Sequence, residues 1–551
     1  MSNTTRMKKR IALPVLLAGA LVLSACSNSS QPPNPKEHDM AHPASAAPQG
    51  DQAKPVSASE DLAQHVLTGN TFTLTAKEST LRLDDNTVKE VWTYNGTVPG
   101  PELRVKQGET IQVVLKNELP EPVTIHWHGL PVTNSMDGIP GVTQNAVKPG
   151  ESFTYQFKAD VRGTYWYHSH QNGVVQVDKG LYGSLVVEPS DPQPVDKDYT
   201  LVLDEWLKDD SMAEIHGGGH AGMNLSNGNP DGGHQAMDMG HSRNGHSGMN
   251  MGSPEMPMSD AEMMPLMYTI FSANGKTGSA IQPLMVKEGD KVRIRLVNAG
   301  FLSHKLNLQG HEFKIVATDG QPINHPPLVS GQLLNIAPGE RYDIEFTANN
   351  PGSWLLEERS SNPGAKSLTV PIVYEGFKTA AAKAESGDLP LLDITQYGEA
   401  AKSHFSLDDK YDVEYTMDLN TKMANGEMAF TINGKTYPDT PPIDVRKGDL
   451  VKVTLVNNSP KDLHPMHLHG HFFQVLSKNG KPVSGSPLVK DTLNLLPGEA
   501  YVVAFKADNP GNWMFHCHDL GHASKGMMTE VKYAGFKPDF TIDPTVNNIP
   551  E

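Results

Sequence analysis

The sequence has little cysteine, no excess of positive charge and no long apolar run, and each shortage excludes a class of protein. Two cysteines among 551 residues exclude a small scaffold held together by disulfides. The 46 Lys and Arg residues are outnumbered by 63 Asp and Glu, giving a net charge of −17, so we expect no nucleic acid partner. The 49 glycines and 42 prolines are typical of many turns between short strands. The length allows three or four domains.

The first 26 residues have the pattern of a lipoprotein signal peptide. Basic residues precede an apolar run over 11–23, which is too short to span a bilayer. The run ends in Leu23-Ser24-Ala25-Cys26, which resembles the bacterial lipobox. We therefore expect a lipid on Cys26 and a protein anchored to the bacterial membrane outside the cytoplasm, at the cell surface or facing the periplasm. An ordinary cleaved signal peptide is the alternative.

The lipid on Cys26 would leave one thiol, Cys517, in an oxidising compartment. A lone thiol there needs a ligand or a catalytic role.

Residues 27–67 are rich in Pro, Ser, Ala and Gln, which predicts a disordered tether between the anchor and the folded body.

Two blocks of sequence occur three times along the rest of the chain. The first block reads KQGETIQVVLKN from Lys106, KEGDKVRIRLVN from Lys287 and RKGDLVKVTLVN from Arg446, and the second contains a Pro-Gly-Glu turn. Alternating apolar and polar residues after a turn indicate half-buried strands. The pattern predicts three tandem antiparallel β-sandwiches of Greek-key type, over residues 68–192, 196–377 and 390–537.

Histidines recur at the same positions of the two outer repeats. Residues i and i+2 of a strand point to one face, about 7 Å apart, so each His-X-His pair can offer two imidazoles to neighbouring metal ions. The middle repeat has Asn307 and Gln309, and Glu357 to Arg359, at the equivalent positions, so we expect no copper site there. The four pairs are His126 and His128, His168 and His170, His467 and His469, and His516 and His518.

Cys517 lies between two paired histidines and therefore points to the opposite face of its strand. His464, three residues before His467, has the same opposite parity and can share a second site with this thiolate. With His522 and a weak thioether from Met527, these side chains would form a blue-copper centre. Spacing alone leaves Met528 as an alternative axial ligand. Zinc more often takes several thiolates, so copper is the better match.

These motifs resemble the four copper signatures of the three-domain multicopper oxidases, the laccase family, including bacterial copper-tolerance cuprous oxidases. The resemblance covers about residues 68–537 and implies an all-β fold of three cupredoxin-like domains with four copper ions. The type 3 pair would lie with the type 2 ion between the first and third domains. The resemblance implies type 1 copper on His464, Cys517, His522 and Met527, type 2 copper on His126 and His467, and type 3 copper on His128, His168 and His518 and on His170, His469 and His516.

The resemblance also implies a mechanism. Electrons enter at the type 1 copper and pass through Cys517 to its neighbouring histidines, and four of them reduce dioxygen to water. Asp137, in Met136-Asp137-Gly138, resembles an acid beside the type 2 copper, and the alternative is a simple turn residue. Relatives often carry an acid directly after the type 1 histidine, where this chain has Ala523, so a second proton donor must lie elsewhere, with Asp519 as a candidate. An axial methionine predicts a modest potential and slow oxidation of difficult phenols.

The second domain carries an insertion over residues 212–267 with 11 methionines and five histidines. Thioethers select cuprous copper, so the segment could recruit that ion. The alternative is a disordered low-complexity loop. Bacterial cuprous oxidases resemble this chain in using Met-rich segments, although in the best-known type the segment lies in the third domain.

Three functions remain open from the sequence. The first is a copper-tolerance oxidase that converts cuprous to cupric ion and also oxidises phenols and diamines. The second is a general laccase whose Met-rich loop only shields the substrate pocket, and the third is a copper-binding lipoprotein without turnover. We expect dioxygen and small reductants as partners, a membrane contact through Cys26, and a monomer.

Overall fold

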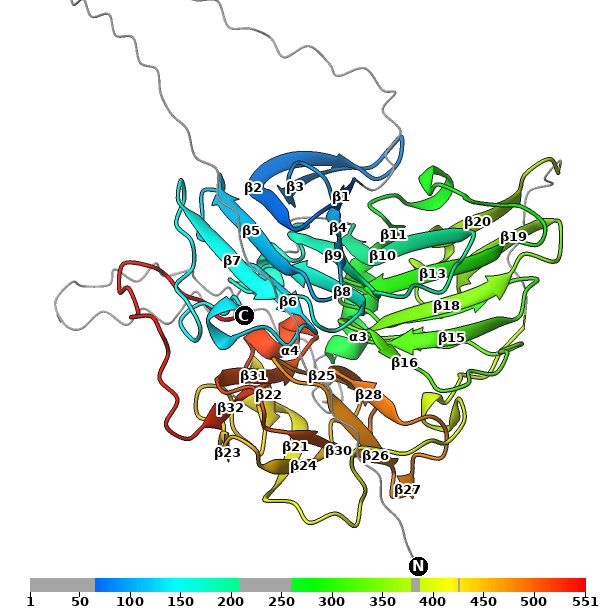
Figure 1. Cartoon of the computed structure of the whole chain (residues 1–551). Helices are drawn as coiled ribbons and strands as arrows, with labels where there is room; N and C mark the ends of the chain where they lie inside the picture. Colours follow the sequence, from blue (N-terminus) through cyan, green and yellow to red (C-terminus); the bar gives the residue numbers. More distant parts are fainter. Residues whose placement is uncertain (1–64, 209–258, 378–386, 425–426) are drawn as a thin grey trace, which may run out of the picture. The chain divides into compact units, whose positions relative to one another are not determined.

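The computed structural model describes residues 65–208, 259–377, 387–424 and 427–551. Cys26, the predicted tether up to residue 64 and most of the Met/His insertion lie outside the described residues. Within the described part of the chain, every helix is too short or too polar to cross a membrane. Figure 1 shows the rest as β-sheets, coloured blue to cyan, green, and yellow to red along the chain.

The first part of the chain forms two sheets. Buried and exposed residues alternate along Thr110–Asn117, and the buried apolar side chains of this strand pack into one core between the sheets. Strand β1 begins at Val66, two residues before the expected start of the first domain. One sheet has the order β3-β2-β5-β7 (Val88–Tyr94, Thr71–Arg82, Thr110–Asn117, Ser152–Lys158), and the other has the order β1-β4-β9-β8-β6 (Val66–Thr68, Gly100–Lys106, Tyr182–Glu188, Gly163–His168, His126–His128).

The second part repeats this arrangement with two sheets of its own. One has the order β11-β10-β13-β18-β15-β16 (Tyr268–Ala273, Lys197–Leu207, Lys291–Asn298, Arg341–Thr347, Phe313–Thr318, Gln321–Pro322). The other has the order β12-β20-β19-β14-β17 (Leu284–Val286, Thr369–Tyr374, Ser353–Glu358, His304–Leu308, Leu334–Ile336).

The third part forms the last two sheets. One has the order β22-β21-β24-β30-β26-β27, with β28 paired to β26 (Glu427–Ile432, Val413–Ala424, Leu450–Asn457, Ala500–Lys506, Phe473–Lys478, Lys481–Pro482, Leu488–Lys490). The other has the order β23-β32-β31-β25-β29 (Ile443–Val445, Met528–Tyr533, Asn512–Cys517, His464–Leu468, Thr492–Leu495).

The predicted all-β fold is confirmed, but the sandwiches are not antiparallel throughout, since each repeat has a parallel strand pair at an equivalent place. Strands β2 and β5, β10 and β13, and β21 and β24 pair in parallel. In each case the chain visits the other sheet between the two strands, so that it returns in the same direction. The remaining pairs around the histidines are antiparallel, including β6 with β8 and β25 with β31.

The helices are short and lie between strands. Helix α3 (Asp260–Met267) is the end of the Met/His insertion, and Ser259 and Glu262 form a capping box that starts it. Helix α4 (Leu520–Ser524) begins directly after the last His-X-His pair and contacts α1 (Gly173–Gln176). The described 3-10 turns are η1 (Asn134–Met136), η3 (Gly278–Ala280), η4 (Ala365–Ser367) and η5 (Ile394–Gln396).

Candidate metal centre

Neighbouring strands carry the four predicted histidine pairs. In the first domain, β6 carries both histidines of its pair, and β8 ends at the first histidine of the other. In the third domain, β25 and β31 each carry the first histidine of a pair, and the second follows directly after the strand. In the sheet registers His126 lies opposite His168, and His467 lies opposite His516, so opposed imidazoles share a face. The eight histidines, each at most 2% exposed, are His126, His128, His168, His170, His467, His469, His516 and His518.

The imidazoles of the first and third domains meet in one cluster. The ring of His126 stacks on that of His469 with 4.0 Å between centroids, and the ring of His128 stacks on that of His467 at 3.7 Å. The ring centroid of His518 lies 4.7 Å from that of His128. Nitrogen atoms approach within 4.8 Å in three sets, which are His126, His467 and His469; His126, His128 and His168; and His170, His469 and His516. The fold thus gathers all eight residues that the sequence assigns to one cluster.

The ring nitrogens of this cluster fit a metal site. Nδ1 of His126 lies 2.8 Å from the carbonyl oxygen of Asp137, and Nδ1 of His168 lies 2.8 Å from that of Ser169. Among the described residues, Nε2 of both rings has no hydrogen-bond partner. A buried polar atom without a partner needs an explanation, and an imidazole held at one nitrogen presents the other to a metal. The residues present therefore fit copper ligation.

Burial keeps most of these imidazoles neutral. It holds the pKa values of His168 and His516 well below the usual value, and neighbouring imidazoles lower them further. Burial would also lower the pKa of His170, but the Glu551 carboxylate outweighs it and raises that pKa. Because a metal binds the neutral imidazole, burial prepares these side chains as ligands.

Asp137 lies between two members of the cluster. Its Oδ1 is 3.3 Å from Nδ1 of His126, and its Oδ2 is 3.0 Å from Nδ1 of His469. The following turn needs glycine, because a Cβ on Gly138 would lie 1.9 Å from the carbonyl oxygen of Ile125. Asp137 is thus a turn residue whose buried carboxylate also holds two imidazoles.

A buried Arg–Asp pair holds another side of the cluster, and the sequence reasoning missed it. Arg341 on β18 donates two hydrogen bonds to Asp491, with N–O distances of 2.7 and 2.6 Å. Oδ1 of Asp491 lies 3.2 Å from Nε2 of His128. Burial alone would raise the pKa of Asp491, but Arg341 lowers it well below the usual value. The available signal was a charged pair, Lys490 and Asp491, inside an otherwise apolar run.

Cys517 faces away from the cluster and meets two other histidines. Its Sγ lies 3.8 Å from Nδ1 of His464 and 3.7 Å from Nδ1 of His522, and these two nitrogens are 3.2 Å apart. All three side chains are buried. Burial raises the pKa of the Cys517 thiol and lowers that of His464, so a soft cation would have to displace the thiol proton.

The strand register separates the two candidate axial methionines. His516 lies opposite Met528 on β32, so Met528 is on the face of the histidine cluster, where it packs against Met514 and Ala523. Met527 is fully buried and belongs to the same apolar core as Cys517. The geometry therefore favours Met527 beside the thiol.

A cavity of about 490 Å³ lies against His522. Three buried carboxylates line it, from Asp260 on α3, Asp462 before β25 and Asp519 at the start of α4. Oδ2 of Asp260 lies 3.8 Å from Nε2 of His522 and 3.5 Å from Nζ of Lys525. The end of the Met/His insertion is thus packed onto the Cys517 site.

Asp519 belongs to this cavity. Its Oδ1 accepts a hydrogen bond from the backbone N–H of His522, and its Oδ2 lies 3.5 Å from Nε2 of the same residue. Burial raises the pKa of Asp519 to about 7. This position beside His522 makes Asp519 a poor candidate for the proton donor to the histidine cluster.

The middle repeat replaces the Cys517 site with an ion triad. His304 occupies the position equivalent to His464, and Glu358 the position equivalent to Cys517. Nε2 of His304 lies 2.6 Å from Oε1 of Glu205, and Nδ1 lies 3.2 Å from Oε2 of Glu358. Burial would lower the pKa of His304, but the two carboxylates raise it to about 10. A protonated imidazole is a poor metal ligand.

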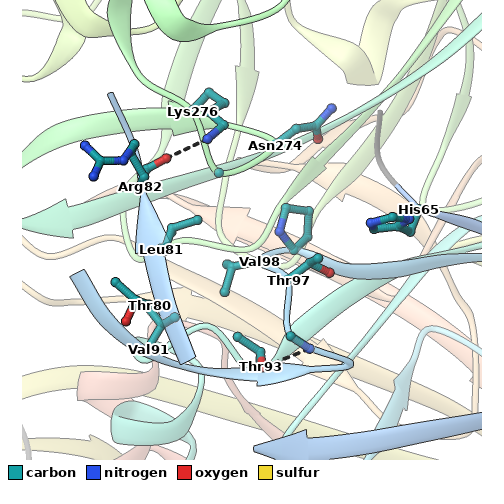
Figure 2. A pocket seen from close by; sticks show the side chains of 13 residues that line it. His65, Thr80, Leu81, Arg82, Val91, Thr93, Thr97, Val98, Asn274 and Lys276 are labelled. Atoms are coloured by element: carbon teal, nitrogen blue, oxygen red, sulfur yellow. Dashed lines mark hydrogen bonds between the residues drawn. The ribbon is translucent and has the colours of Figure 1, made fainter. Parts of the chain in front are cut away.

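A second cavity, of about 220 Å³, lies away from these groups (Figure 2). It is lined by strands β2 and β3 and by the turn around Lys276, whose Nζ donates a hydrogen bond to the carbonyl oxygen of Arg82 at 2.6 Å. Its described lining includes one imidazole, His65, without a carboxylate or thiol, so it offers no metal-ligating set.

Family models match three parts of the chain. All three are described as multicopper oxidase, and they match residues 75–192, 197–373 and 408–535. These ranges cover most of the three pairs of sheets, although the first begins after β1.

Curated relatives match over most of their length. The chain is 30% identical to the multicopper oxidase MmcO of Mycobacterium tuberculosis, over 96% of this chain and 97% of the relative. It is 25% identical to a copper resistance protein A homolog of Pseudomonas syringae, over 85% and 92%. The crystal structure of a multi-copper oxidase from Pseudomonas thermotolerans superposes with a TM-score of 0.61 at 28% identity, covering 85% of this chain and all of that one.

Proposed function

Because the chain belongs to the multicopper oxidase family, it is a copper-dependent oxidoreductase that uses dioxygen, and we propose that it oxidises cuprous ion outside the cytoplasm in copper tolerance. The name of the copper resistance relative supports this role. The three predicted domain ranges and the lipid anchor on Cys26 are part of the proposal. They are supported by the repeats and the lipobox-like sequence.

The proposed ligand sets are those that the sequence motifs imply, and the close approach of these side chains supports them. His464, Cys517 and His522 would hold the type 1 copper, with the thioether of Met527 as a further, weak ligand. Type 2 copper would be held by His126 and His467, and the type 3 pair by His128, His168 and His518 and by His170, His469 and His516.

The chain's own residues connect the two sites. Copper supplies the one-electron chemistry and the reduction of dioxygen when it is bound. Cys517 is covalently joined to His516 and His518, so the backbone would offer a path of one residue between the two sites. Asp137 and Asp491 orient the imidazoles through their outer nitrogens.

The acidic cavity at His522 is the observation that carries the proposed substrate. Asp260, Asp462 and Asp519 place three buried carboxyl groups around the edge of an imidazole that leads to Cys517. Lys525 balances part of this charge through Asp260. The lining also includes Glu262 and one lysine, Lys305, so acidic groups outnumber basic ones around the cavity. An excess of negative charge concentrates cations, so the cavity favours a cation over a neutral donor.

The described end of the Met/His insertion, helix α3, lines this cavity. Met264 of α3 lines it, and the backbone N–H of Ala261 donates a hydrogen bond to Asp462 at 3.1 Å. Thioethers favour cuprous over cupric copper. The insertion can therefore collect cuprous ion and deliver it to the carboxylates although it belongs to the second domain.

Oxygen uptake by copper-loaded protein tests this proposal. The wild type is compared with a variant in which residues 212–257 are replaced by a short Gly-Ser linker, which keeps α3. We expect cuprous oxidation to fall at least tenfold in the variant while oxidation of a phenolic donor is kept or increased. Equal activity of both proteins toward cuprous ion would contradict the role of the insertion.

A general laccase activity is the second candidate. Phe301, Leu302 and Pro363 line the same cavity and give it an apolar wall that suits an aromatic ring. Phenol turnover that exceeds cuprous turnover in the wild type would favour this function. A copper-binding lipoprotein without turnover does not agree with the family to which the chain belongs.

A further inference from the structure

We propose that Glu551 is a positioning residue of the copper cluster, whose carboxylate fixes the imidazole of His170. This inference rests on the ligand set proposed above. The side chain of Glu551 is 1% exposed, and its Oε1 lies 2.8 Å from Nε2 of His170 and 3.9 Å from Nδ1 of His516. Apart from these imidazoles, no described residue offers a hydrogen bond to either carboxylate oxygen.

His170 otherwise differs from its neighbours in the cluster. Six of the other imidazoles have one ring nitrogen next to a protein oxygen. Backbone carbonyls serve His126, His168, His467 and His516, the Thr492 hydroxyl serves His128, and the Asp137 carboxylate serves His469. For His170, Oε1 of Glu551 lies in this place, 2.8 Å from Nε2, and neither ring nitrogen has a hydrogen bond of regular geometry within the described residues. Glu551 thus gives His170 what protein oxygens give these six imidazoles, which is a partner for one ring nitrogen that leaves the other to a metal. Within the described residues His518 has no such partner.

The segment that carries Glu551 is fixed on the first domain beside His170. The amide of Gln171 donates to the carbonyl oxygen of Asn547 at 2.8 Å and accepts from the backbone N–H of Ile549 at 3.0 Å. The backbone N–H of Asn172 donates to the carbonyl oxygen of Ile549 at 2.9 Å. These contacts hold residues 547–549 in one register and deliver the next side chains toward the cluster.

The position opposite Glu551 is shaped to receive a carboxylate. A Cβ on Gly173, at the start of α1, would lie 2.4 Å from Oε2 of Glu551. Glycine therefore leaves the room that this oxygen occupies. Asp543, which precedes this segment, forms an ion pair with Lys148 of the first domain at 2.8 Å.

Copper retention tests the inference in the full chain. The variants are E551A, E551Q and, as a control, D539N, which changes an exposed acid in the same segment. Each copper-loaded protein is dialysed against increasing chelator, and total copper is compared with the visible absorption of the Cys517 site. We expect E551A to lose cluster copper at about 10–100-fold lower chelator concentration than wild type, with the Cys517 absorption unchanged.

The conservative variant separates positioning from a structural role. The amide of E551Q can still accept a hydrogen bond, so we expect it to retain copper better than E551A. Retention by E551A equal to that of D539N would overturn the inference. Parallel loss of the Cys517 absorption and of thermal stability in E551A and E551Q would also overturn it, because it would show only a structural role. Cuprous oxidation is measured separately on the wild type, so that its absence would refute the proposed substrate without touching copper retention.

Discussion

Asp260 Oδ2 lies 3.8 Å from Nε2 of His522, although the two residues are separated by most of two domains in the sequence. This contact places the end of the Met/His insertion at the point where electrons are proposed to enter. The proposed cuprous oxidase activity depends on it.

Replacing Asp260 should therefore impair cuprous oxidation selectively. We expect D260N to lower kcat/KM for cuprous ion about tenfold, because the cavity loses one of its three buried carboxyl groups. Oxidation of a neutral phenol should change less than twofold. The control is D408N, which changes an exposed acid of the third domain. Equal losses for both donors would instead indicate damage to the Cys517 site.

The axial ligand can be tested by exchanging methionines. We expect M527L to raise the reduction potential of the Cys517 site, because the thioether stabilises the oxidised ion. M528L should leave the potential and the visible absorption unchanged, since Met528 lies on the other face of its strand. Redox titration followed by absorption decides between them. A shift in M528L without one in M527L would reverse the assignment.

Removal of Arg341 should destabilise the protein and the cluster together. R341A leaves Asp491 buried without its cation, which costs about 3–5 kcal/mol. We expect a lower thermal midpoint and weaker copper retention in this variant than in wild type. Calorimetry and metal analysis measure the two effects. In the double variant R341A/D491N the loss of stability should be smaller, and an equal or larger loss would contradict this explanation.

The His304 triad predicts a pH dependence of stability. The pKa of His304 is about 10 in the folded protein and 6.5 ordinarily, so its protonation favours the folded state. This contribution is complete below pH 6.5 and is lost as the pH rises toward 10. We expect the thermal midpoint of wild type to fall more steeply over this range than that of H304Q. Parallel curves in calorimetry would show that the triad contributes nothing.

Much of the fold and of the site could be predicted from the three sequence repeats and from the alternation of side chains between the two faces of a strand. Strand periodicity placed the histidine pairs on one face and Cys517 on the other, as the sheet registers have it. The parallel joints were not predictable, because they depend on a chain path between two sheets and not on the local pattern of a strand.

The residues that hold the histidines of the cluster could not be predicted from the sequence for a different reason. Asp491 and Arg341 come from different domains, and Glu551 reaches His170 from 381 positions away in the chain. None of them has a fixed spacing from the residue that it holds. Only the tertiary contacts bring them to the cluster.

The most direct test of the proposed function is the stoichiometry of oxygen uptake by copper-loaded wild-type protein with cuprous ion as the sole donor. We expect about four cuprous ions to be oxidised for each dioxygen consumed, without release of peroxide, because four one-electron transfers reduce dioxygen to water. Oxygen uptake sustained by a phenolic donor but absent with cuprous ion would contradict it.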